Sequence, residues 1–242
     1  MHLLLTVGVL SYYSIWIVDA DFNTEVSARV QDFIADYLQI VTRSAYGPYH
    51  SIIYGNAGVN LTNPQQTSMK LLYQSKTTFP ESSNVYIGME TGLFYGYLAE
   101  TYQVNTAKVA KRYSIYYTIN RDGSPGQYIL NTSYDARTRP WYKTIKAAKS
   151  PTWTQTYLSA TTGTSVFNFG IPLLANNSNP SSAFIGAISV AAYLTDLTKY
   201  LVKAYAKTST NVFIVDQATG QLLASTLGIP VNTKSSTGVL VT

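Results

Sequence analysis

Apolar residues recur at three- and four-residue spacing along residues 21–44, which is the spacing of one face of an α-helix. These positions are Phe22, Val26, Val30, Phe33, Tyr37 and Val41. Gly47 and Pro48 follow, and this pair predicts the end of the helix. A second helix is predicted to begin at Asn63–Pro64, with Asn63 as the N-cap, and to stop before Phe79–Pro80. The chain therefore opens with a long helix and a shorter one.

From residue 84 onward the pattern changes to the alternation that is typical of β-strands. Residues 84–99 predict a β-hairpin, and residues 211–225 predict another. Between them we predict strands at 112–120, 127–132, 157–160, 165–175 and 184–193, with helices at 141–149 and 194–207. This order indicates an α+β fold, in which a long N-terminal helix packs on one antiparallel sheet.

Residues 3–18 are uncharged and mostly apolar, which favours a membrane anchor. A cleaved signal peptide, with residues 18–20 as the cleavage site, is the alternative. Both interpretations place the rest of the chain on the extracellular or periplasmic side of the cell membrane. We therefore divide the chain into an anchor or signal segment (1–20), a stalk helix with one module (21–208), and the start of an incomplete second module (209–242).

Composition narrows the function further. Only 12% of the 242 residues are charged, against roughly a quarter in ordinary soluble domains, and the net charge of +5 includes no long basic run. This argues against a nucleic-acid partner. The absence of cysteine and the presence of only His2 and His50 argue against a metal site. The sequence shows no pair of carboxylates placed for acid–base catalysis and no activated nucleophile, so we do not expect an enzyme. Nothing in the sequence suggests a cofactor.

One stretch, residues 134–157, combines basic and aromatic side chains. No Asp or Glu occurs from Ala136 to Thr195, which predicts that the basic residues of the stretch have no acidic partner near them in sequence. These residues are Arg137, Arg139, Lys143, Lys146 and Lys149. Arginine forms a planar fork that fits a carboxylate, and Tyr and Trp add apolar walls. The stretch is therefore either a pocket for an anionic or aromatic ligand, or a solvated basic helix face with aromatic residues in the core.

Three sequons match the N-glycosylation pattern, at Asn60, Asn131 and Asn176. Asn176 lies in a predicted polar loop and is the favoured site of the three. In a chain this rich in Asn, Ser and Thr, chance alone predicts about this number of matches. They make the chain a candidate glycoprotein in a eukaryotic host only.

The block Tyr134–Tyr142 (YDARTRPWY) resembles the double Cache family of extracytoplasmic sensor domains. Residues 186–190 leading into 194–197 support the resemblance, which covers about residues 21–225. It implies a long N-terminal helix followed by two PAS-like modules, with small molecules bound in the membrane-distal one. Residues 211–225 then correspond to the opening hairpin of the membrane-proximal module.

The resemblance also implies a ligand site. In amino-acid-binding members the ligand carboxylate is held at positions that match Arg139, Trp141, Tyr142 and Tyr157. The acids that hold the ligand ammonium match Ala191 and Ser159 here, unless Asp122 or Asp135 replaces them from a loop. A buried ammonium without a carboxylate partner is costly. We therefore expect a carboxylate, another anion or a neutral aromatic molecule rather than an α-amino acid.

These observations predict a non-enzymatic ligand-sensing domain of a membrane receptor, attached through its N-terminal segment. The apolar stripe of the stalk helix predicts docking on its own domain, and part of it also predicts pairing with a second copy in a homodimer. The alternative is a structural or adhesive surface glycoprotein that uses a Cache-like scaffold with a degenerate pocket.

Overall fold

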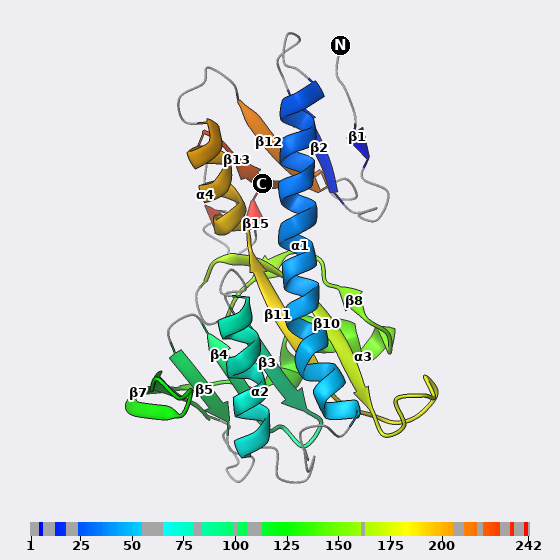
Figure 1. Ribbon diagram of the computed structural model, residues 1–242, viewed down its shortest axis with the longest axis vertical. Helices are drawn as coiled ribbons and strands as arrows, with labels where there is room; N and C mark the ends of the chain where they lie inside the picture. The colour runs from blue at the N-terminus through cyan, green and yellow to red at the C-terminus, as the bar shows by residue number, and fades with distance from the viewer. Residues whose placement is uncertain are drawn as a thin grey trace. The chain divides into compact units, whose positions relative to one another are not determined.

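The structure is a computed structural model in which two compact units are described. The smaller unit comprises residues 1–37, 158–166 and 193–242, and the larger one residues 38–157 and 167–192. Figure 1 shows the elements of both. The described residues are 5–6, 13–17, 24–54, 65–79, 84–98, 101–105, 113–160, 163–205, 211–216, 220–227, 233–234 and 240–241.

An antiparallel sheet of nine strands forms most of the larger unit. Its order is β7-β6-β5-β4-β3-β11-β10-β8, and β9 pairs with β10. The strands are β3 (Asn84–Met89), β4 (Phe94–Leu98), β5 (Thr101–Asn105), β6 (Tyr113–Ile119), β7 (Pro125–Ser133), β8 (Thr152–Trp153), β9 (Tyr157–Leu158), β10 (Ser165–Leu174) and β11 (Phe184–Tyr193). The predicted hairpin at 84–99 and the α+β fold are confirmed. Strands β5 and β8 were not predicted.

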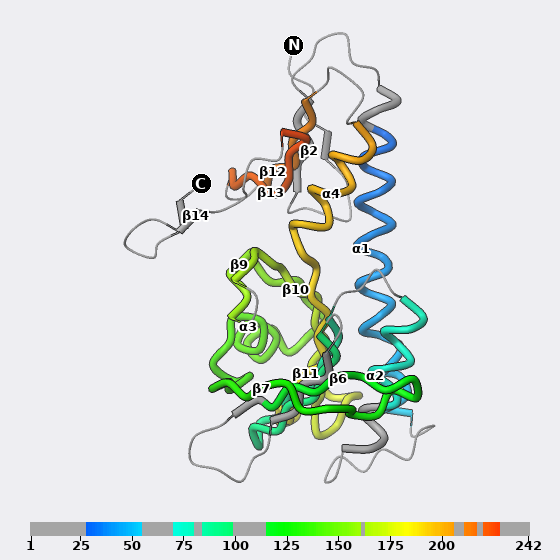
Figure 2. Tube along the Cα trace, turned by 90° about the vertical axis from the view of Figure 1, so that its left-hand side faces the viewer, coloured from blue at the N-terminus to red at the C-terminus, as the bar shows by residue number. Residues whose placement is uncertain are grey.

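Helices cover both faces of this sheet. Figure 2 shows α3 (Pro140–Ala148) on one side, and α2 (Gln65–Thr78) with the end of α1 (Thr24–Ile53) on the other. On the α1 side, the rings of Tyr46 and Phe169 lie 5.8 Å apart. On the α3 side, a Cβ on Gly88 would lie only 2.9 Å from the Trp141 ring. A side chain at position 88 would therefore push α3 away from the sheet.

Helix α1 continues past Gly47–Pro48, so the predicted end of this helix is wrong. Proline has no N–H, and inside a helix it leaves the carbonyl four residues earlier without its usual donor. That carbonyl belongs to Ser44, and the buried hydroxyl of Ser75 from α2 donates to it at 2.6 Å. Because α2 supplies the missing donor, α1 can extend to Ile53, and Ile52 is buried.

Replacing Ser75 by alanine is expected to lower the free energy of unfolding by about 1–2 kcal/mol, because the Ser44 carbonyl loses its donor while it stays buried. Urea unfolding measures this change. Ser51→Ala is the matched control, since the Ser51 hydroxyl donates to a carbonyl of its own helix at an exposed position. Equal destabilisation by both variants would show that the contact between the helices contributes nothing.

The smaller unit contains a four-stranded sheet in the order β1-β2-β12-β13. Its strands are β1 (Leu5–Thr6), β2 (Tyr13–Ile17), β12 (Val212–Asp216) and β13 (Leu222–Ser225). Helix α4 (Leu194–Tyr205) belongs to this unit, where the ring of Tyr200 stacks on Phe33 of α1. The predicted hairpin at 211–225 is confirmed as β12 and β13. Strands β14 (Thr233–Lys234) and β15 (Leu240–Val241) pair separately.

The N-terminal segment was predicted to be an anchor or a signal. Its described part differs from a membrane helix, because Tyr13–Ile17 forms strand β2 and pairs with β12. Within the described ranges, no helix combines the length and the apolar character needed to cross a membrane. The sequence also placed α4 with the first module, whereas its contacts place it in the smaller unit. Anchoring and the module boundaries stay predictions.

Candidate functional site

The block at residues 134–142 forms two helical segments in succession. A 3-10 turn, Ala136–Thr138, is capped by Asp135, whose carboxylate accepts from the Arg137 N–H at 3.0 Å. Helix α3 then begins at Pro140, where the missing N–H of proline costs nothing. Arg139 occupies the N-cap between the two segments and makes no side-chain cap. The first turn of α3 contains no acidic residue.

The side chain of Arg139 lies against an aromatic ring. Its guanidinium carbon is 4.6 Å from the centroid of the Tyr134 ring, within the range of a cation–π contact. Its Nε is buried and finds no hydrogen-bond partner among the residues that the structure describes. Such a group is costly to leave unpaired, so Arg139 has a donor available for a ligand.

Aromatic side chains in contact with one another connect Arg139 to the sheet. The indole N–H of Trp141 donates to the Tyr134 hydroxyl at 3.4 Å, and the Trp141 ring lies 4.9 Å from Tyr86 of β3. Phe94 of β4 packs against both Tyr134 and Tyr86. Trp141 is only 2% exposed. Arg139 and Trp141, two of the predicted ligand residues, therefore both contact Tyr134.

Tyr157, the third predicted residue, enters a polar cluster on the same sheet. Its hydroxyl donates to Oδ1 of Asn168 at 2.5 Å. The amide nitrogen of Asn168 donates to the Tyr86 hydroxyl and, at 3.1 Å, to Oγ of Ser189. The sequence did not single out Tyr86, Asn168 or Ser189. The available signal was a polar residue inside an otherwise apolar strand, at Asn168 of β10 and Ser189 of β11.

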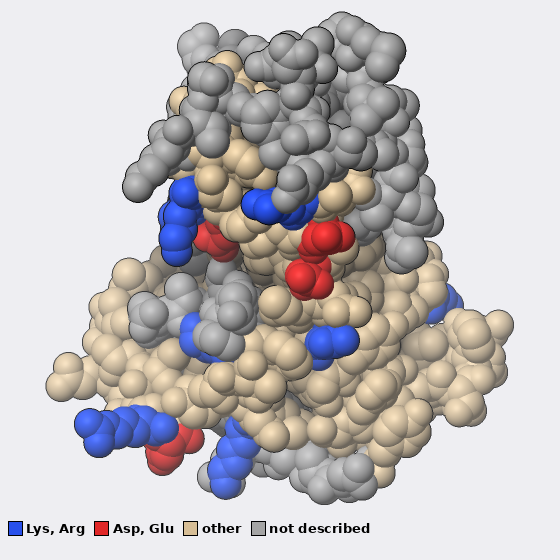
Figure 3. All heavy atoms as spheres, turned by 45° about the horizontal axis from the view of Figure 1, so that its top comes forward, with Lys and Arg blue, Asp and Glu red and all other residues tan. Residues whose placement is uncertain are grey.

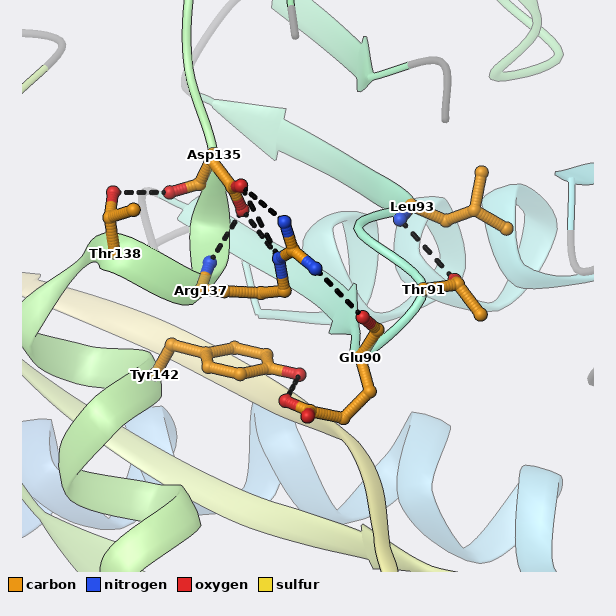
Figure 4. A network of polar contacts seen from close by, with 7 residues as sticks. All are labelled: Glu90, Thr91, Leu93, Asp135, Arg137, Thr138 and Tyr142. Carbon is orange, nitrogen blue, oxygen red and sulfur yellow. Dashed lines mark hydrogen bonds and ion pairs between the residues drawn. The ribbon is translucent and has the colours of Figure 1, made fainter. Parts of the chain in front are cut away.

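Tyr142, the fourth predicted residue, directs its hydroxyl to Glu90 at the end of β3, as Figure 4 shows. That oxygen-to-oxygen distance is 2.9 Å, and Lys146 contacts the other carboxylate oxygen of Glu90 at 2.7 Å. Arg137 donates to the Glu90 carbonyl at 3.2 Å and pairs with Asp135. The network fastens α3 to the turn between β3 and β4.

The electrostatics of this network favour an ionised Glu90. Partial burial alone would raise the pKa of Glu90, but hydrogen bonds from Lys146 and Tyr142, with the charges of Lys146 and Arg137, bring that pKa below its usual value. Burial, then the hydrogen bond to Glu90, raises the pKa of the Tyr142 phenol. Tyr142 therefore stays protonated and donates to Glu90.

Replacing Glu90 by glutamine is expected to lower the free energy of unfolding at pH 7 by about 1 kcal/mol, since Glu90 is partly exposed. A lowered folded-state pKa gives stability that is present above the unfolded pKa and lost as pH falls through the folded pKa. The difference in stability between wild type and variant should therefore shrink as the pH is lowered from 7 toward 3. Urea unfolding at both pH values measures this. Asp32→Asn on the exposed side of α1 is the control, and an equal Glu90→Gln effect at both pH values would contradict this account.

The expected lack of acidic partners is wrong for two cations. Arg137 pairs with Asp135 at 2.7 Å, and Lys146 pairs with Glu90 from far away in the sequence. Asp135 is thus engaged, and the exposed Asp122 accepts from Ser124 within its own turn. Both acids therefore already have partners within their own segments.

Ala191 and Ser159, which the sequence resemblance aligns with ammonium-binding acids, carry no charge. Ala191 is 3% exposed in β11, where it pairs with Asn84 of β3. It lies two residues from Ser189, so both side chains are on the same face of the sheet. Ser159 follows β9, and its N–H donates to the carbonyl of Thr164.

Among the described residues on the face in Figure 3, the Lys and Arg side chains are few and lie apart from one another. Among the described residues, no group of three His, Asp or Glu lies close enough to hold a metal ion. Asn131 and Asn176 are exposed, in β7 and in the loop after β10, whereas Asn60 lies outside the described residues. Glycosylation stays a prediction.

Known sensor domains resemble this chain in sequence and in fold. Residues 80–199 match a family model described as the methyl-accepting chemotaxis protein-like, first PDC sensor domain. The ligand-binding domain of the Campylobacter jejuni chemoreceptor Tlp3, solved with 4-methylisoleucine, is 17% identical over 88% of this chain and 70% of that chain, with a TM-score of 0.54. The complex of the same domain with L-norvaline gives the same values. No curated protein matches the chain.

Proposed function

Because residues 80–199 of this chain belong to the methyl-accepting chemotaxis protein-like PDC sensor domains, which are Cache-type domains, we propose that its ligand is a small carboxylate held by Arg139. The chain carries the ligand-sensing domain of a receptor, which faces outward from the membrane. The proposal includes the charge of the ligand and the residues that bind it. It also includes membrane anchoring by residues 3–18 and pairing of two copies through α1.

One observation carries this proposal: Arg139 is a cation with a buried N–H that has no partner among the described residues. Its neighbours differ, because Arg137 is paired with Asp135 and Lys146 with Glu90. A carboxylate would accept from the guanidinium in charge-assisted hydrogen bonds, which are stronger than neutral ones. The arrangement therefore favours an anion at Arg139 over one at the other two cations.

The beginning of α3 adds a second attraction for an anion. The first N–H groups of a helix have no partner within the helix, and the helix dipole makes this end positive. Arg139 is the N-cap of α3, so its side chain starts where these N–H groups lie. A carboxylate beside Arg139 would accept from both sources, with Trp141 as an apolar wall.

The rest of the ligand is expected to carry no ammonium group. The two related structures contain 4-methylisoleucine and L-norvaline, each of which is an amino acid. In this chain, Ala191 and Ser159 stand at the positions matching the ammonium-binding acids. Glu90 and Asp135, two acids of the larger unit, are already paired with Lys146 and Arg137. An ammonium buried among Ala191, Ser189 and Asn84 would lack a counter-charge. Burying an ion without a partner costs on the order of several kcal/mol.

Thermal unfolding with two ligands of the same carbon skeleton tests this proposal. Pentanoate is expected to raise the Tm, by about 5–10 °C at a hundred times its Kd, whereas L-norvaline is expected to raise it much less. Stabilisation by L-norvaline alone would overturn the proposed ligand class. If no acid in a panel of mono- and dicarboxylates stabilises the chain, the degenerate-pocket alternative is favoured instead.

A further inference from the structure

A hollow of about 190 Å³ lies between the end of α1 and α2, within the larger unit. Its walls come from Gly47, Pro48 and Ser51 of α1 and from the second half of α2, and every residue that lines it is uncharged. These two helices cover the face of the sheet opposite α3, as Figure 2 shows. A cavity of about 150 Å³ is large enough to bind benzene. The hollow can therefore hold a molecule built on a single ring.

The fold itself gives no reason for a glycine at position 47. Glycine destabilises the interior of a helix, and it is usually kept where a positive φ or a close neighbour excludes a side chain. Gly47 lies inside α1 without a positive φ, and among the described residues a Cβ on it would meet nothing within 4 Å. By contrast, a Cβ on Gly170 would collide with Ile145. What the missing side chain of Gly47 does provide is room in the hollow, and such departures from local preference are expected at functional sites.

Two serine hydroxyls at the hollow already use their protons. The Ser75 hydroxyl donates to the Ser44 carbonyl at 2.6 Å, and the Ser51 hydroxyl donates to the Gly47 carbonyl at 3.1 Å. The first of these bonds is secured by Pro48, because the Ser44 carbonyl has no donor in its own helix. A hydroxyl has one proton, so toward a ligand both serine oxygens can only accept. They suit an O–H or N–H group and offer nothing to an anion, which also only accepts.

We propose that this hollow is a second binding site, which takes a small uncharged molecule with a ring-sized apolar body and a hydrogen-bond donor. An ion would lose its hydration there without gaining a counter-charge, because no lining residue is charged. Pro48 and Leu71 would contact the apolar body, and Ser51 and Ser75 the donor. The site shares no residue with the Arg139 block, so it goes beyond the proposed function and does not depend on it.

Titration of the ¹⁵N-labelled chain with phenol, followed by NMR, measures both the binding and its place. Phenol is expected to shift the amide signals of Ser51 and Gln74 saturably. Benzoate and benzylammonium have a ring of the same size but carry a charge, so they should bind there at least about tenfold more weakly. Anisole cannot donate, and it should bind about fivefold more weakly than phenol.

Two results of this titration would overturn the inference. If phenol causes no saturable shift at Ser51 and Gln74, the hollow is not a binding site for it. If phenol, anisole and the charged probes bind there equally, the hollow does not select the proposed class of ligand.

Gly47→Leu separates binding from stability. Its side chain enters the open space, so the affinity for phenol should fall at least about tenfold, while the Tm of the unliganded protein should stay equal or rise because leucine favours a helix more than glycine does. Gln39→Leu is the matched control, since Gln39 is exposed on α1 and does not line the hollow. It should change the Kd of phenol by less than about twofold. If Gly47→Leu lowers the Tm, Ser51→Leu, one turn further along α1, is the variant that decides; unchanged phenol binding in the deciding variant would contradict the inference.

Arg139→Ala distinguishes failure of this inference from failure of the proposed function. It is expected to abolish the pentanoate effect and to leave phenol binding at the hollow unchanged. Loss of phenol binding in this variant would place phenol at Arg139 and refute the inference alone. If the variant keeps both the pentanoate effect and phenol binding at the hollow, the proposed function fails and the inference stands.

Discussion

Replacing Arg139 by alanine is expected to abolish the rise in Tm that pentanoate causes. A hydrogen bond to a charged partner contributes about 1.5–3 kcal/mol, and a guanidinium fork can make two. Losing them weakens binding by at least about tenfold to a hundredfold. The unliganded variant should differ from wild type by no more than about 1 kcal/mol, because the lost cation–π contact with Tyr134 is offset by removal of a buried unpaired N–H.

This pairing of a large binding effect with a small stability effect separates a ligand contact from a structural one. Arg121→Ala is the charge-matched control, since Arg121 is exposed in the turn before β7. Arg139→Lys keeps the charge but loses the planar fork, so it should bind with intermediate affinity. Full retention of the pentanoate effect in Arg139→Ala would remove Arg139 from the site.

Replacing Ala191 by aspartate is expected to shift binding from carboxylates toward α-amino acids. Position 191 is buried on the same sheet face as Ser189. A carboxylate there would be buried beside the uncharged Ser189 and Asn84, which should destabilise the unliganded protein by about 3 kcal/mol or more. L-Norvaline would supply an ammonium and recover much of that loss, so its effect on Tm should exceed that in wild type. Pentanoate should stabilise the variant less than it does wild type.

Ala191→Asn is the control for size, because it adds a side chain of the same shape without the charge. It is expected to gain no preference for L-norvaline. If Ala191→Asp folds and L-norvaline fails to stabilise it more than Ala191→Asn, position 191 does not face the ligand. In that case the lack of an acid there says nothing about the ligand class.

Much of the fold could be predicted because the long helix carries one apolar stripe and the strands are rich in apolar residues, although the central strands β3, β10 and β11 are buried almost throughout and do not alternate. The exceptions have local causes. Pro48 predicts a helix end, but the sequence does not reveal that Ser75 would donate to the carbonyl that Pro48 leaves without a donor. Strand β8 has only two residues, and its register is set by pairing with β10 rather than by any pattern of its own.

The site residues likewise divide into those that the sequence predicts and those that it does not. Arg139 and Trp141 lie in one short block whose composition already indicates a binding site. Glu90 and Asn168 act through partners that are distant in sequence, Tyr142 for one and Tyr86 for the other. Neither residue belongs to a motif. The strand order β3-β11-β10 brings Asn168 to Tyr86, and the position of α3 brings Tyr142 to Glu90.

A crystal structure of the chain with pentanoate tests the central claim most directly. The account predicts the ligand carboxylate within hydrogen-bond distance of the Arg139 guanidinium, beside Trp141. A ligand bound elsewhere in the larger unit, such as the hollow of about 190 Å³ between α1 and α2 lined by Pro48 and Gln74, with Arg139 still lacking a partner for Nε, would contradict it.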